Sequence, residues 1–212
     1  METLLGIALG LALSAACGFR VFVPLFALGA AEASGYVTLT PDFAWIGTPV
    51  ALVAFGVATA AEIVAYYVPW LDNLLDTLAT PAAVVAGILV TASVVTDMDP
   101  WWRWTLAIVA GGGLAGTVQS GTTVMRAASS GTTGGLANPL LATGELGGAV
   151  ALSIAALVVP LVALVLVLAG LTVLVVRLRR RRAAQAAAIA RSASAVYDRA
   201  PSPSHGRAPQ PW

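Results

Sequence analysis

Apolar stretches constrain the fold of this chain more than any other feature, because most of them are long enough to cross a bilayer. A helix that spans the hydrocarbon core needs about 20 apolar residues. The chain is 58% hydrophobic and only 10% charged, whereas soluble domains carry about 25% charged residues. The sequence therefore predicts an all-α, polytopic integral membrane protein with about five transmembrane helices. The stretches are Leu4 to Ala30, Phe43 to Val68, Pro81 to Val95, Trp102 to Met125 and Gly147 to Val176.

Basic residues directly after the last stretch predict the orientation of the chain. Arginines occupy position 177 and the whole of 179–182, and membrane proteins keep such clusters in the cytoplasm. Five crossings then place the N-terminus outside, whereas a sixth crossing or a re-entrant segment would change this. We expect a transmembrane domain at 1–182 and a cytoplasmic tail at 183–212. Residues 183–190 can extend the last helix, and the proline- and serine-rich end from Ser192 is predicted to be disordered.

Two connecting segments carry predictions of their own. Trp70 to Thr80 places leucines at helical spacing with Asp72 and Asp76 on another side, which is typical of an amphipathic helix at the interface. Residues 127–146 are too polar and glycine-rich for a lipid-facing helix, yet they contain leucines. Irregular backbone at membrane depth is tolerated only where protein buries it or where it lines a cavity. We expect a re-entrant or cavity-lining loop there, with an ordinary external loop as the alternative.

The charged residues Arg20, Glu62, Arg126 and Glu145 lie within or beside the apolar stretches. An ionised side chain in hydrocarbon costs roughly 2.5–3.5 kcal/mol on insertion scales, so such residues face a partner or a cavity. Glu62 has apolar residues on both sides and is the hardest to place in water. We expect it to pair with one of the two arginines. Snorkelling of either arginine to the headgroups is the alternative, and an ion pair that only holds helices together explains the pattern as well.

The order of these charges indicates two distantly related halves, at about 1–96 and 97–182. Each half supplies an arginine and then a glutamate, and the second half adds Asn138 before Pro139. Inverted repeats with broken helices are common in transporters, whose binding sites lie where the repeats meet. The spacings in the two halves differ, and small residues such as those at 111–116 also permit plain helix packing. Candidate substrate-binding or ion-pairing residues are Arg20, Glu62, Arg126, Glu145, Asn138, Asp72 and Asp76.

Other classes of site find little support in the sequence. The only histidine lies in the polar tail and there is one cysteine, whereas a zinc site needs three or four ligands. We expect no metal and no cofactor. Hydroxyl residues in 120–129 have no histidine base within the membrane, and nothing sets the distance between Glu62 and Glu145 that paired acid–base catalysis requires. We therefore expect no enzyme, and we expect no nucleic-acid partner beside a bilayer.

Several motifs resemble a bacterial membrane-protein family known as domain of unknown function 4126, over about residues 1–175. Many members carry Asp-Lys where this chain has Tyr66-Tyr67, so the chain resembles a distinct branch of the family. The resemblance implies a bacterial plasma-membrane protein and no established activity. The matching pieces are Ala16-Cys17-Gly18-Phe19-Arg20 with Pro24, the run from Glu62 to Asp72, Leu74-Leu75-Asp76-Thr77, Thr80-Pro81, Arg126, Thr132-Thr133-Gly134-Gly135, Asn138-Pro139 and Glu145.

The sequence thus favours a transporter-like or channel-like protein of the bacterial inner membrane. Its partners would be the bilayer and a small solute or lipid headgroup, with an anion favoured by the two arginines. The main alternative is a membrane scaffold that transports nothing. The sequence is compatible with a homo-oligomer.

Overall fold

The computed structural model describes residues 2–199, without side chains at 69–77, 178, 181, 182, 184 and 187–199. The described residues form helices and no strand, which confirms the all-α prediction. Two units are distinguished, Met1–Val167 and Leu168–Trp212. The helices are α1 (Glu2–Cys17), α2 (Phe22–Ala33), η1 (Pro41–Gly47), α3 (Pro49–Ala65), α4 (Pro69–Val94), α5 (Pro100–Leu106), η2 (Ala107–Gly112), α6 (Gly113–Thr133), α7 (Asn138–Val158) and α8 (Pro160–Arg199).

Breaks divide several of the stretches that the sequence predicts as single spans, the first and the last among them. The first stretch becomes α1 and α2, separated at 18–21. The last becomes α7 and α8, because Pro160 disfavours the helical conformation of the preceding residue. Val159 accordingly has φ −138° and ψ 69°. The prediction of one long span over Gly147 to Val176 is therefore wrong.

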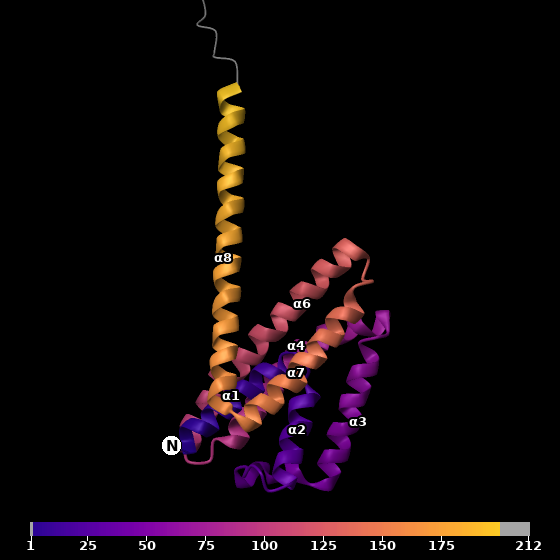
Figure 1. Cartoon of the computed structure of the whole chain (residues 1–212), viewed down its shortest axis with the longest axis vertical. Helices are drawn as coiled ribbons and strands as arrows, with labels where there is room; N and C mark the ends of the chain where they lie inside the picture. The colour runs from indigo at the N-terminus through magenta and orange to yellow at the C-terminus, as the bar shows by residue number, and fades with distance from the viewer. Residues whose placement is uncertain (1, 200–212) are drawn as a thin grey trace, which may run out of the picture. The chain divides into compact units, whose positions relative to one another are not determined.

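The polar segment 127–146 is helical on both sides of a short turn at 134–137, so the irregular backbone predicted for it is wrong. α6 continues to Thr133, α7 begins at Asn138, and α6 and α7 run in opposite directions from the turn between them (Figure 1). Hydroxyl side chains in this segment bond back to their own helix. Thr132 Oγ1 donates to the carbonyl of Ala128 at 2.9 Å, and Thr133 Oγ1 donates to that of Ser129 at 2.8 Å. These bonds satisfy the polar groups without unwinding the helix.

Two further predictions differ from the structure. The helix predicted at Trp70 to Thr80 is not separate, because it continues into the next apolar stretch as α4 with Pro81 inside it. The side chains of Asp72 and Asp76 lie outside the described residues. At the other end, α8 continues past Ser192 to Arg199, where disorder is predicted. The rest of the predicted tail, 200–212, lies outside the described residues.

Length and composition identify two membrane-spanning candidates among the described residues, α7 and the Pro160–Arg177 part of α8. A third is added if η1 and α3, which meet at a bend of 62°, form one span. Three apolar helices are shorter, namely α1, α2 and Leu78–Val94 within α4. The structure therefore supports helices that can cross a membrane, and it does not confirm five.

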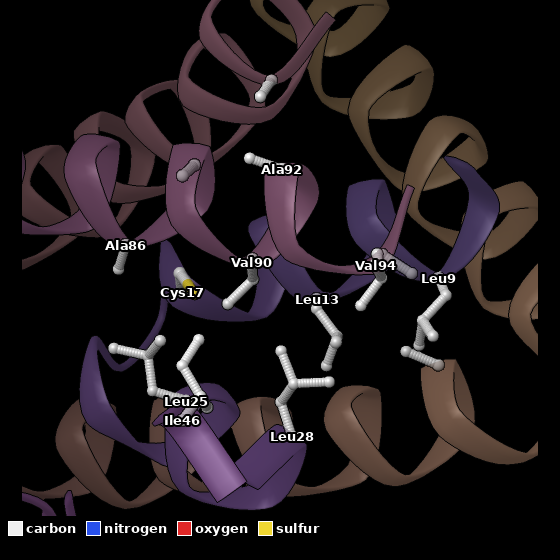
Figure 2. Packing of buried hydrophobic residues seen from close by; sticks show 14 of the residues in the cluster. Leu9, Leu13, Cys17, Leu25, Leu28, Ile46, Ala86, Val90, Ala92 and Val94 are labelled. Atoms are coloured by element: carbon white, nitrogen blue, oxygen red, sulfur yellow. The ribbon is translucent and has the colours of Figure 1, made fainter. Parts of the chain in front are cut away.

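Small residues bring α1, α4 and the η2–α6 segment into close contact. Ser14 Oγ donates to the carbonyl of Gly87 at 2.7 Å and lies 2.7 Å from Thr91 Oγ1. A Cβ on Gly111 would lie 2.4 Å from Thr91 Oγ1 and 2.8 Å from the Gly87 carbonyl oxygen. Buried apolar side chains continue the contact, with Leu13 of α1 beside Val90 of α4 (Figure 2). Close helix approach through small residues is a common source of stability in membrane proteins.

The first prediction compares two neighbouring glycines. We expect Gly111→Ala to destabilise the protein by about 1–3 kcal/mol, because overpacking forces the backbones of α4 and η2 apart. Gly113→Ala is the matched control, since a Cβ there meets nothing within 4 Å. Thermal melting of the detergent-purified variants measures the difference. Equal melting temperatures would contradict the close packing described above.

Candidate functional site

The corner between α1 and α2 carries Arg20 into the interior. Gly18 lets this corner pack on α6, because a Cβ there would lie 2.5 Å from Val118 Cβ and 2.6 Å from the Ala115 carbonyl oxygen. Arg20 is only 1% exposed. Snorkelling of Arg20 to the headgroups, the alternative considered above, does not fit such burial.

Glu145 of α7 joins Arg20 to Arg126 of α6. Arg126 Nε donates to Glu145 Oε1 at 3.1 Å, and Arg126 Nη2 also contacts Glu145 Oε2. Arg20 Nη2 lies 3.7 Å from Glu145 Oε2 and donates to the Ala142 carbonyl at 2.8 Å. The side chains of Arg20, Arg126 and Glu145 are 1%, 3% and 10% exposed. One buried carboxylate thus serves two guanidiniums that come from the two halves of the chain.

Tyr66, at the end of α3, lies against both arginines. The guanidinium carbon of Arg20 is 3.8 Å from the ring centroid and that of Arg126 is 4.1 Å from it. Both distances fall within the range of cation–π attraction. The sequence prediction did not include Tyr66 in the site. Its position four residues after Glu62 is the signal that places it on the same face of a helix.

Glu62 of α3 has different partners from those predicted. Its Oε1 accepts the backbone N–H of Val21 at 2.9 Å, and its Oε2 accepts that of Phe22 at 3.2 Å. Within the described part of the chain it forms no ion pair with Arg20 or Arg126. The first amides of a helix have no partner within the helix and carry partial positive charge. The predicted Glu62–arginine pair is therefore wrong, because the N-terminus of α2 takes both carboxylate oxygens.

The remaining candidate residues lie apart from these contacts or outside the description. Asn138 Nδ2 donates to Ser130 Oγ at 3.2 Å, across the turn between α6 and α7. The side chains of Asp72 and Asp76 are not described. We use the term arginine cluster for Arg20, Tyr66, Arg126 and Glu145, and the term α2 corner for Arg20, Val21 and Phe22 with Glu62.

The family model of a domain of unknown function (DUF4126) matches residues 7–181. The chain belongs to this family. The matched range contains every residue of the arginine cluster and of the α2 corner. No match was found among curated proteins or among solved structures.

In this DUF4126 protein, Arg20 keeps hydrogen-bonding capacity that the described residues do not use. Its Nε and Nη1 are buried and have no acceptor among those residues. A buried polar group left without a partner costs about 1–3 kcal/mol, and more when it is charged. Chemically, the arginine cluster is suited to accept an oxyanion, because guanidinium donors bind carboxylate and phosphate oxygens strongly.

The second prediction concerns the shared carboxylate. Glu145→Gln keeps the shape of the side chain but leaves two buried guanidiniums without their common counter-charge. We expect a loss of about 3–5 kcal/mol of stability, the usual cost of removing one partner of a buried ion pair. Melting of the purified protein in detergent measures this loss.

Asp42→Asn provides the comparison for this variant. It breaks the ion pair with Arg103, in which the Asp42 side chain is 74% exposed. The Arg103 side chain is only 10% exposed, but water around Asp42 screens the pair, so its contribution should be about 0–1 kcal/mol, as in surface pairs. If Glu145→Gln melted no earlier than Asp42→Asn, the arginine cluster would not be an important source of stability.

Proposed function

We propose that this DUF4126 protein is a transporter-like or channel-like membrane protein that moves a small anionic solute or an anionic lipid headgroup. Arg20 and Arg126 bind the anion, Tyr66 holds the two guanidiniums in place, and Glu145 offsets part of their charge. The observation that carries the proposal is Arg20, which is 1% exposed and has two donor nitrogens without acceptors among the described residues. Protein interiors rarely keep such donors unless a ligand or water completes them.

The origin of the cluster residues supports the same reading. Arg20 and Tyr66 come from the first half of the chain, and Arg126 and Glu145 come from the second. Arg20 lies where the first apolar stretch breaks into α1 and α2. Transporters built from inverted repeats bind their substrates at such breaks between the halves. The relation of the two halves as inverted repeats is part of this proposal.

The proposal includes a multi-pass topology in a bacterial inner membrane with the arginine-rich part of α8 on the cytoplasmic side. Five crossings remain the prediction. Arginine bias near the end of a span determines orientation, and Arg177, Arg179 and Arg180 lie in α8 beyond its apolar part.

The third prediction tests the topology. A cysteine introduced by Arg207→Cys should be labelled in intact cells only after the membrane is permeabilised. Cys17 is fully buried and gives no background in folded protein. Labelling of intact cells by a membrane-impermeant maleimide would place the C-terminus outside and contradict the proposed orientation.

A non-transporting scaffold is the second candidate, and one observation favours it. The contacts of Glu145 and Ala142 tie α6, α7 and the corner before α2 together, as a purely structural ion-pair network would do. In the scaffold case, the arginines would affect stability and assembly alone. We propose no enzymatic activity, since the arginine cluster supplies no nucleophile with an adjacent base.

The fourth prediction separates transport from scaffolding. Purified protein in liposomes should pass at least one member of a panel of carboxylate, phosphate and glycerol-phosphate anions. Arg20→Lys and Arg126→Lys keep the charge but lose the planar donors. We expect flux to fall about tenfold or more, because a hydrogen bond to a charged group contributes about 1.5–3 kcal/mol.

Arg103→Lys is the control for these variants, since Arg103 pairs with Asp42 away from the cluster. Its flux should match that of the wild type. If no anion crosses liposomes that contain folded protein, or if all three variants behave alike, the scaffold becomes the better account.

A further inference from the structure

The N-terminus of α2 holds a carboxylate that comes from another helix. Two N–H groups at this end, on Val21 and Phe22, donate to the two oxygens of Glu62. No side chain at the N-cap position, Val21, supplies the usual local cap. Helix N-termini bind anions through such amides and through the helix dipole. The protein has thus placed an internal anion where a helix of 12 residues offers an anion site.

Arg20 is a second and independent sign of a ligand at the same corner. It directly precedes Val21 in the chain, its residue is 1% exposed, and its Nε and Nη1 have no acceptor among the described residues. Its charge acts on Glu62, although the two do not form an ion pair within the described structure. A helix cap explains why the amides are filled. The cap does not explain why two buried nitrogens of Arg20 have no acceptor among the described residues.

We propose that the α2 corner is an oxyanion-binding site and that Glu62 is its internal ligand, which a carboxylate or phosphate group of the substrate displaces. This inference rests on the proposed function and adds the position at which the anion binds. In the state described by the structure, the carboxylate of Glu62 occupies the amides. When the substrate enters, its oxygens accept the same two N–H groups and the unused donors of Arg20.

The charges at the buried corner couple this exchange to the uptake of a proton. A second anion beside an ionised Glu62 would place two negative charges in a low-dielectric site, which is costly. The charged groups that act on Glu62 are Arg20 at the corner and Glu145 from α7, and Glu62 acts in turn on Cys17 at the end of α1. Tyr66 follows Glu62 by four residues and contacts Arg20. Arg20 is already needed by the incoming anion. Glu62 therefore takes up one proton from water as a monovalent anion binds, and the charge of the corner is unchanged.

The test uses formate and the full-length protein in detergent, with binding measured by titration calorimetry. For the wild type, the apparent affinity for formate should rise about tenfold for each unit by which the pH falls from about 8 to about 6, as linkage to one proton requires. The calorimetric heat should depend on the ionisation enthalpy of the buffer, with one proton taken up per formate. Binding without proton uptake, or no binding of formate, would overturn the proposal.

Glu62→Gln gives the sharper comparison. The amide keeps one oxygen to accept an N–H but turns an NH₂ group toward the other, so formate displaces it easily. We expect this variant to bind formate at least tenfold more tightly than the wild type at about pH 8, with no pH dependence left. Glu32→Gln is the matched control, because Glu32 accepts the N–H of Leu39 at 2.9 Å away from Arg20. It should bind formate as the wild type does.

Two outcomes of the variants would count against the proposal. If affinity and pH dependence were unchanged in Glu62→Gln, Glu62 would not compete with the anion. If Glu32→Gln raised the formate affinity as Glu62→Gln does, the effect would be one of charge at a distance. If Glu62→Gln does not fold, the proton count of the wild type decides alone. Competition with bound formate identifies the source of the oxyanion, since dissolved glycerol phosphate represents a free solute and phosphatidylglycerol in mixed micelles represents a lipid headgroup.

This experiment measures binding and not flux, so it fails separately from the proposed function. Proton-linked binding in a protein that carries no anion across liposomes would retain the site and remove transport. Flux without proton-linked formate binding would retain transport and remove Glu62 as the internal ligand.

Discussion

The carboxylate of Glu145, whose side chain is only 10% exposed, links the two halves of the chain in the interior of this protein. Glu145 contacts Arg126 and lies 3.7 Å from Arg20, so it balances cations from both halves of the chain. Removing ions from water costs several kcal/mol each, and excellent geometry is needed to recover that cost. Tyr66 adds its ring to both guanidiniums. The positions of α6, α7 and the α1–α2 corner follow from the need to keep these charges paired.

The same constraint links the fold to the proposed function. Beside the carboxylate that the two guanidiniums share, Nε and Nη1 of Arg20 have no acceptor within the described part of the chain. The α2 corner adds two N–H groups that already hold an anion, the side chain of Glu62. Stability and binding therefore use the same residues. In our account, the state without substrate is held by an internal carboxylate, and the substrate completes the site by replacing it.

Much of this arrangement follows from the sequence, but its partners do not. Charges in apolar stretches rarely face lipid, and the sequence therefore predicted Arg20, Arg126 and Glu145 as candidate site residues, with Glu62 as the partner of an arginine. It could not predict that Glu62 prefers backbone amides, because the break that exposes them depends on Gly18 packing against Val118. Polarity suggested a loop at 127–146, whereas bonds from hydroxyls such as Thr133 back to their own helix satisfy that polarity locally. Local composition predicts exposure more readily than it predicts such tertiary pairing.

The most direct measurement is an experimental structure of the full-length protein in lipid nanodiscs with selenate, whose selenium scatters strongly enough to be located. Our account predicts selenate oxygens about 2.7–3.2 Å from Arg20 Nε and from the N–H groups of Val21 and Phe22. It also predicts that the Glu62 side chain has left these amides. A structure in which Glu62 still caps α2, and in which protein atoms alone accept the remaining donors of Arg20, would contradict the account.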